Sequence, residues 1–339
     1  MRGIVPSRVG VMSGPSTSRT FRADRGDARV RRLDLAVLRR LEDRPEISRA
    51  QVQAWIDSGL VRVNSVPAAK ASSRVAAGDE IEVVLPPPPP PPPLPLAQEM
   101  PVSILYEDEH LLAVDKPAGL VVHPTHGYFK GTLLNALLWR SREWGGEERR
   151  PGLVNRLDRD TSGVLLVAKG PEMHAALVRA FRARKAEKEY LAVVHGRTPF
   201  AKGRIDLRIL RHPQDRRRMT TSKTEGRESS TLYERLAESP EEPLSLVRCR
   251  LLTGRTHQIR VHLKALGLPI VGDPVYGEPR WKGIRAPELA AFCRDFPRQA
   301  LHARRVSLVH PATGATLVVV APVPADLEGL LAAAGLARA

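Results

Sequence analysis

The chain has 339 residues and is strongly basic, with 53 Lys and Arg against 37 Asp and Glu, for a formal net charge of +16. Hydrophobic residues make up 42% and charged residues 27%, which predicts a packed core and excludes wholesale disorder. The length allows two domains. Phosphates neutralised by Lys and Arg release counterions, so this charge favours nucleic acid as partner over a basic protein without one.

The N-terminal region and a run of prolines divide the chain. Residues 1–31 are rich in Arg and Ser, which predicts a disordered basic arm and leaves a transit peptide as the alternative. Eight consecutive prolines at 86–93 form an extended spacer without internal hydrogen bonds. We therefore expect a small domain over 32–85, a linker over 86–99 and a large domain over 100–335.

The small domain is predicted to have two helices followed by strands. Ser48 is a candidate N-cap and Gly59 ends the second helix. Strands are expected at 61–64 and 80–85. This order, with SGLVRVNS in the middle, resembles the S-four RNA-binding module, which is named after a small-subunit ribosomal protein. That resemblance implies that Arg39 and Arg49 contact RNA, whereas a generic helical cap is the alternative reading.

The large domain is predicted to mix strands and helices without regular βαβ alternation, which favours an α+β fold with a mixed, mainly antiparallel sheet. No apolar run approaches 18 residues, so no membrane span is expected. The two cysteines, Cys249 and Cys293, lie far apart and predict reduced, part-buried thiols in the cytoplasm. The expected elements are two strands around residues 107–108, a helix over 131–138, a strand over 163–169, a helix over 173–185, strands over 189–196 and 244–252, and a helix from 257 to 267.

The string NRLDRDTSG at 155–163 is the first candidate for chemistry. If RLD is extended, Arg156 and Asp158 point to the same face, and the guanidinium would lower the pKa of the carboxyl. An ionised Asp can attack a sugar carbon. The alternative is a surface Arg–Asp pair that closes a turn.

The second candidate is the segment GRTHQIRVHLKALG at 254–267, with Thr256 as N-cap and Gly267 as the stop. Away from its apolar stripe, His257, Arg260 and Lys264 are spaced by three and four residues. Such a cluster suits phosphate or an ion pair with a buried carboxylate, and a solvated helical face is the alternative.

Two further segments carry weaker signals. Tyr190 begins a strand, where a tyrosine is more often core than catalyst, although a phenol beside a reacting base can accept a proton. RHPQDRRRM at 211–219 is too charged for a core element and predicts a loop over RNA. The scattered His123, His126, His195 and His302 show no metal-ligand spacing. GxGxxG and Walker-type loops and a Ser–His–Asp elbow are absent from the sequence.

Taken together, eight ordered strings resemble the RluA-type pseudouridine synthases, and within them the ribosomal large-subunit pseudouridine synthase D group. The resemblance covers about residues 32–335, including the small module. The strings are DKPAGLVVHP (115–124), GTLLNALL (131–138), NRLDRDTSG (155–163), KEYLAVVHG (188–196), RHPQDRRRM (211–219), GRTHQIRVHL (254–263), IVGDPVYG (270–277) and QALHARRVSLVHP (299–311).

The resemblance implies roles for individual residues. Asp158 would attack the anomeric carbon of a flipped uridine or abstract the neighbouring ribose proton. Tyr190 would stack on the base and remove the leftover proton, Arg260 would pair with Asp158, and Arg156 would occupy or vacate the space of the flipped base. The remaining RNA-binding candidates are Arg255, His257, Lys264, Arg216, Arg217 and Arg218.

The same resemblance implies ribosomal RNA as partner, most readily that of the large subunit, and a cytoplasmic monomer that uses no metal or organic cofactor. Two positions depart from the family pattern: Asn155 stands where the string usually begins with His, and Ser65 where Gly commonly follows. We expect activity to survive the change at position 155. Two alternatives are a catalytically silent RNA-binding or ribosome-assembly protein on the same fold, and a glycosidase, which normally needs a second acidic group.

Overall fold

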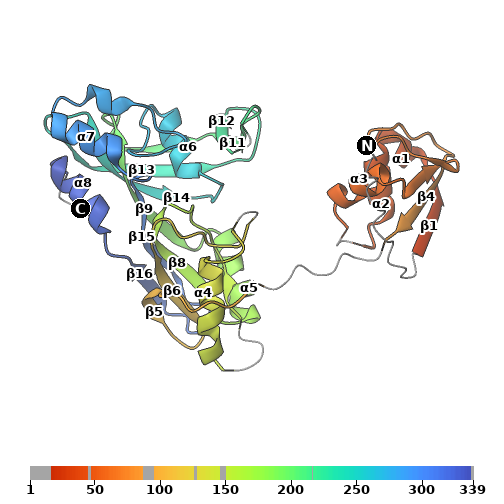
Figure 1. The fold of residues 1–339 in the computed structure, drawn as a ribbon, viewed down its shortest axis with the longest axis horizontal. Helices are drawn as coiled ribbons and strands as arrows, with labels where there is room; N and C mark the ends of the chain where they lie inside the picture. Colours follow the sequence, from red (N-terminus) through yellow and green to blue (C-terminus); the bar gives the residue numbers. More distant parts are fainter. Residues whose placement is uncertain are drawn as a thin grey trace, which may run out of the picture. The chain divides into compact units, whose positions relative to one another are not determined.

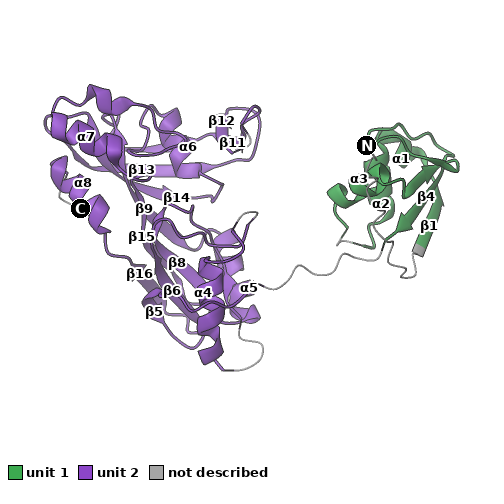
Figure 2. Ribbon diagram, in the orientation of Figure 1, with its two compact units in different colours: residues 1–93 green, residues 94–339 purple. Residues whose placement is uncertain are grey.

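The computed structural model describes residues 17–44, 47–86, 95–125, 128–145, 150–215 and 217–336. The chain divides into two compact units, residues 1–93 and 94–339 (Figure 2). Apart from Pro86, the run of prolines lies outside the described residues, as do residues 1–16 of the predicted arm.

The small unit is a four-stranded antiparallel sheet in the order β1-β4-β2-β3 with three helices. Its elements are β1 Thr17–Arg22, α1 Arg25–Arg29, α2 Leu33–Arg40, α3 Arg49–Asp57, β2 Val61–Val63, β3 Val66–Pro67 and β4 Glu80–Leu85. Ser48 caps α3 in a capping box with Gln51, and Gly59 follows that helix with a positive φ of 73°. Both predicted helix boundaries are therefore confirmed.

The prediction of a disordered arm up to residue 31 is wrong from residue 17 onward, because the fold of this unit begins before residue 32. Strand β1 pairs along its whole length with β4, from Thr17 opposite Leu85 to Arg22 opposite Glu80. Helix α1 is then fixed by Asp27, which is fully buried and paired with Arg39 and Arg40 of α2. The part of the predicted arm from residue 17 onward thus belongs to the fold, because its few acidic side chains anchor it.

The large unit is built on a ten-stranded sheet (Figure 1). Eight strands run in the order β10-β13-β14-β9-β15-β8-β6-β5, while β16 pairs with β15 and β7 with β8. Between described strands of this sheet, β8 and β15 form the parallel pair and the other pairs are antiparallel. The strands are β5 Ser103–Glu107, β6 Leu111–Lys116, β7 Gly152–Leu153, β8 Ser162–Ala168, β9 Glu187–His195, β10 Lys202–Asp206, β13 Ser230–Glu238, β14 Leu244–Leu251, β15 Leu301–Val309 and β16 Thr316–Val320.

Helices and a separate hairpin flank this sheet. The helices are α4 Leu133–Arg140, α5 Pro171–Arg182, α6 Gln258–Ala265, α7 Pro287–Asp295 and α8 Ala325–Ala333, with 3-10 turns at Ser141–Glu143 and Arg280–Gly283. The hairpin comprises β11 Arg208–Arg211 and β12 Met219–Ser222. The predicted α+β architecture is confirmed. Among the described residues, no helix is both long and apolar enough to cross a membrane.

Strand β8 lies at the centre of the hydrophobic packing. All seven of its residues are buried, because alternate side chains enter two different clusters: Leu165 and Val167 in one, Val164 and Leu166 in the other. This explains why the strand reads as a continuous apolar run instead of an alternating one. The segment that carries Asp158 leads directly into β8 and is therefore attached to a strand that is buried along its whole length.

Candidate active site

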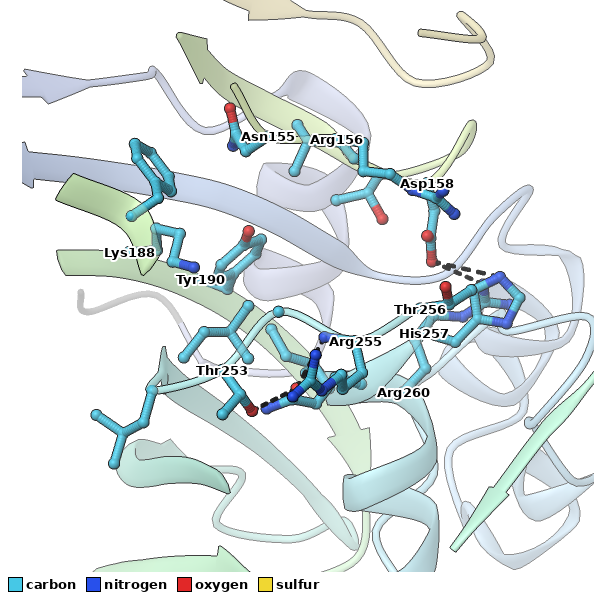
Figure 3. Close-up of a pocket in the computed structure, with 18 of the residues that line it drawn as sticks. Asn155, Arg156, Asp158, Lys188, Tyr190, Thr253, Arg255, Thr256, His257 and Arg260 are labelled. Carbon is cyan, nitrogen blue, oxygen red and sulfur yellow. Dashed lines mark hydrogen bonds and ion pairs between the residues drawn. The ribbon is translucent and has the colours of Figure 1, made fainter. Parts of the chain in front are cut away.

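A cavity of about 530 Å³ opens between the segment before β8 and the segment that joins β14 to α6 (Figure 3). Its volume is within the roughly 300–1,000 Å³ of small-molecule pockets. Strand β9 supplies Tyr190 and Lys188 to its wall, and the end of α5 adds Arg182. The other polar lining residues are Asn155, Arg156, Asp158, Thr161, Arg184, Thr253, Arg255, Thr256, His257, Gln258 and Arg260.

Arg260 joins two carboxylates that lie far apart in the sequence. Its Nη1 donates to Oδ2 of Asp158 at 2.9 Å, and its Nε and Nη2 donate to the two oxygens of Asp273 at 2.7 and 2.8 Å. The side chain of Asp273 is fully buried, whereas that of Asp158 is 22% exposed and lines the cavity. Arg260 is thus fixed from behind by Asp273 and presents one N–H to Asp158.

The surroundings of Arg260 and Asp273 favour the charged forms of both side chains. Burial tends to lower the pKa of Arg260, but hydrogen bonding to Asp273 and the charges of Asp273 and Asp158 raise it above its usual value. Burial also opposes ionisation of Asp273, whose pKa is nevertheless lowered by Arg260 and by backbone N–H groups of Tyr276 and Val275. His257 also approaches this group, with its Nε2 3.9 Å from Oδ2 of Asp158.

Hydrogen bonds hold the backbone around Asp158 in place from several sides. Nζ of the fully buried Lys116 donates to the carbonyl oxygens of Pro117, Leu120 and Arg159 at 2.7–2.9 Å. Three acceptors match the three N–H bonds of an ammonium group. Burial lowers the pKa of Lys116 to about 7, against the charges of Asp160 and Asp158, which favour the ammonium.

Strand β15 and the segment before it hold the same turn on its other side. Arg298 is ion-paired with Asp326 of α8 and donates Nη1 to the carbonyl of Asp160 at 3.3 Å. At Gly163, with a φ of 110°, a Cβ would lie 2.2 Å from the carbonyl oxygen of Ala303. The glycine that ends the 155–163 string is therefore required by the close approach of β15.

Tyr190 lies on β9, in the middle of the sheet, and is only 7% exposed. Its phenol reaches the cavity, so the residue belongs both to the core and to the site. Burial raises the pKa of Tyr190, and the nearby charge of Asp158 raises it further. The phenol therefore carries its proton at neutral pH.

The two arginines expected beside Asp158 take different positions. Arg260 is its ion-pair partner, as the family resemblance implies, whereas Arg156 is exposed at the cavity wall. The predicted N-cap of α6, Thr256, is wrong. The N-cap is His257, which takes a left-handed backbone with a φ of 56°. Its ring contacts outside the helix outweigh the preference for a hydroxyl at this position.

Other predicted RNA contacts lie away from the cavity lining. Lys264 approaches Glu278 at 4.0 Å, and Arg217 is ion-paired with Asp215 in the loop between β11 and β12. Arg218 lies in that loop too, while Arg216 is outside the described residues. In the small unit, Arg39 pairs with Asp24 and Asp27, and Arg49 with Asp34. These Arg side chains therefore help to hold their own fold, and their exposed fractions of 42% and 47% leave surface for RNA.

Sequence reasoning missed Asp273, Lys116 and Arg298 as parts of this site. Asp273 belongs to the string IVGDPVYG, in which it is the one acidic residue, and this was a signal that could have been used. Cys249 and Cys293 are free and buried, and burial raises the pKa of each thiol to about 12. Within the described residues, no group of three His, Cys, Asp or Glu is placed to hold a metal ion.

Comparison with known proteins identifies the family. A family model described as RNA pseudouridylate synthase matches residues 110–265, and one described as S4 domain matches residues 31–81. The chain is 43% identical over 294 residues to the ribosomal large subunit pseudouridine synthase D of Xanthomonas campestris and 44% identical over 294 residues to that of Xylella fastidiosa. In both cases 85% of each chain is covered. The solved structure of human RNA pseudouridylate synthase domain containing 4 matches with a TM-score of 0.54 and 26% identity, covering 68% of this chain and 92% of that one.

The protein is therefore an RNA-modifying isomerase: it belongs to the RNA pseudouridine synthases. Within them it is a member of the RluA family with an S4 domain, through which it binds RNA. The predicted family and the predicted enzyme class are confirmed.

Proposed function

We propose that the chain converts specific uridines of large-subunit ribosomal RNA to pseudouridine, with Asp158 as the group that attacks the ribose. The observation that carries this proposal is the carboxylate of Asp158 at the wall of a basic cavity, held at 2.9 Å by a buried arginine. The substrate class is supported by the names of the two bacterial relatives, which are ribosomal large subunit pseudouridine synthases.

The reaction requires one glycosidic bond to break and one carbon–carbon bond to form. Asp158 attacks the anomeric carbon or removes the adjacent ribose proton, and the bond from that carbon to N1 of uracil breaks. The uracil rotates and its carbon five bonds to the anomeric carbon. In the first route the bond between that carbon and Asp158 breaks at this point, and in the second Asp158 returns the proton to the ribose. Carbon five then loses its proton and N1 gains one, so the product is an isomer of the substrate. The cation of Arg260 favours the ionised carboxylate that the first step needs.

The target base must leave its helical stack to reach Asp158, which costs a few kcal/mol. Cationic side chains around the opening, among them Arg156, Arg182 and Arg255, are placed to contact phosphates and offset that cost. The aromatic ring of Tyr190 supplies a flat surface for the flipped uracil.

The proton on carbon five leaves in the last step, and Tyr190 is the side chain proposed to take part in that transfer. Because the pKa of its phenol is raised, little phenolate is present before RNA binds. Transfer through Tyr190 therefore requires the phenol to pass its own proton on as it accepts the new one. Asp158, whose charge lies close enough to raise that pKa, is the proposed acceptor.

The position of the second carboxylate near Arg260, that of Asp273, argues against the glycosidase alternative. A glycosidase needs an acid across the scissile bond, roughly 5–9.5 Å from the first carboxylate. Asp273 is buried behind Arg260, with its oxygens engaged by that guanidinium and by two backbone N–H groups. It is therefore not available to protonate a leaving group.

The proposal is tested by mapping pseudouridines in ribosomal RNA from cells that carry or lack the gene. We expect one or a few sites in large-subunit RNA to lose pseudouridine when the gene is absent and to regain it on complementation. Loss of sites in transfer RNA alone, with large-subunit RNA unchanged, would contradict the substrate assignment.

A further inference from the structure

Tyr276 lies outside the cavity lining, yet at 1% exposure it is more completely buried than Tyr190. It packs with Ile209 of β11 and Val261 of α6, so it forms the seam between the hairpin and the helix that carries Arg260. The guanidinium of Arg260 lies over its ring at 5.0 Å. A phenol buried this deeply needs hydrogen-bond partners.

The Tyr276 hydroxyl has two hydrogen-bond partners, one on each side. The backbone N–H of Met219, the first residue of β12, donates to the phenol oxygen at 2.7 Å. The other neighbour of that oxygen is Nδ1 of His257 at 2.8 Å. Since the phenol also has one hydrogen to donate, the O–H bond points to Nδ1.

This arrangement selects one tautomer of His257. A neutral imidazole that accepts at Nδ1 carries its proton on Nε2. The Nε2 atom lies 3.9 Å from Oδ2 of Asp158, so the N–H is on the side of the carboxylate (Figure 3). Burial lowers the pKa of His257, against the charge of Asp158, which agrees with a neutral ring.

The backbone of His257 is held in an unfavourable conformation. It is the N-cap of α6 with a φ of 56°, a left-handed conformation that costs a non-glycine residue of order 1–3 kcal/mol. The ring stands edge-on to that of Tyr276, with an interplanar angle of 78°. The imidazole thus meets Tyr276 through both a hydrogen bond and a ring contact.

We propose that Tyr276 is a positioning residue that fixes His257 in its Nε2–H tautomer against Asp158 and ties this site to the β11–β12 hairpin. The inference rests on the proposed function of Asp158. The hairpin carries Arg217 and Arg218, which are expected to contact RNA, and its Met219 N–H is held by the same hydroxyl. A displacement of the hairpin would therefore reach His257 through one shared atom.

The test is Tyr276→Phe in the full chain, which keeps the ring and its contact with Arg260 and removes only the hydroxyl. The matched control is Tyr106→Phe, because the Tyr106 hydroxyl also donates one short hydrogen bond, to Asp108 at 2.7 Å, on β5. We expect Tyr276→Phe to lower kcat about tenfold, with the KM for RNA within about twofold of the wild type. The control should leave both constants unchanged.

A second readout does not depend on turnover. The ¹⁵N chemical shifts of the His257 ring report its tautomer, and we expect the Nε2–H form in the wild type and a mixture in Tyr276→Phe. In a His257→Gln background, adding Tyr276→Phe should have no further effect on kcat.

Equal kcat for Tyr276→Phe and the control, an unchanged tautomer, or full additivity with His257→Gln would each overturn the proposal. An inactive wild type on ribosomal RNA would instead count against the proposed function, and the tautomer measurement would still decide the role of Tyr276.

Discussion

Replacing Arg260 with Met should separate the structural role of this cation from its role at Asp158. The substitution leaves the fully buried carboxylate of Asp273 without its charge partner. Removing one member of a buried pair typically costs 3–5 kcal/mol. We therefore expect the free energy of unfolding in urea to fall by about 3–5 kcal/mol, a large part of the 5–15 kcal/mol of an ordinary domain.

The double variant Arg260→Met, Asp273→Asn should recover most of that loss. The neutral amide keeps an oxygen that accepts from the backbone N–H groups of Val275 and Tyr276, which Asp273 binds at 2.9 Å. Without a buried charge, the remaining deficit should be about 1 kcal/mol. The control is Arg248→Met, whose partner Glu234 is partly exposed, so its cost should stay below about 1 kcal/mol.

Activity should not follow stability in this series. Uridine labelled with tritium at carbon five releases the label on isomerisation, which gives a direct assay. Because Asp158 loses its cation in both variants, we expect roughly a 100-fold or greater loss of kcat in each. A single variant as stable as the Arg248→Met control would refute the buried-pair reasoning, and a double variant with wild-type turnover would refute the role of Arg260.

Three further predictions concern other parts of the chain. Asn155→His, which restores the common family residue, should change kcat by less than about threefold; a gain of tenfold or more would show that Asn155 limits the reaction. Deleting residues 1–95 should weaken RNA binding and flatten the dependence of the logarithm of the binding constant on the logarithm of salt concentration, whereas an unchanged slope would exclude the S4 domain as a phosphate contact. Burial lowers the pKa of His302 to about 4, from an ordinary 6.5. The unfolded state therefore binds the proton first, and stability is lost as the pH falls from 6.5 toward 4. The wild type should lose about 2 kcal/mol more than His302→Gln between pH 7.5 and pH 5, and equal losses would contradict this.

Local patterns predicted most of the elements correctly because their signals lie within one segment. The capping box at Ser48 and the apolar run of β8 are examples, since neither depends on distant residues for its sequence signature. Strand β1 escaped prediction because its partner β4 lies some sixty residues away and its own residues are mostly polar. Its membership of the sheet comes from pairing and from the buried Asp27, not from its pattern.

The site itself is built from contacts that the sequence does not encode locally. Asp158 and Arg260 are 102 residues apart, and only the family resemblance joined them in advance. Nothing in the periodicity of α6 distinguishes Arg260 from Lys264, yet one is buried between two carboxylates and the other lies outside the cavity lining. The contacts of Asp273 and Tyr276 likewise join different segments of the chain, which no local pattern predicts. The catalytic roles of Asp158 and Tyr190 stay predictions until they are measured.

The most direct test of the central claim is the turnover of Asp158→Asn on large-subunit ribosomal RNA, measured by tritium release from carbon five together with RNA affinity. The amide is almost the same size as the carboxylate but cannot act as nucleophile or base. We predict that pseudouridine formation is abolished while the Kd for RNA stays within about twofold of the wild type. Turnover within about tenfold of the wild type would contradict the assignment of Asp158.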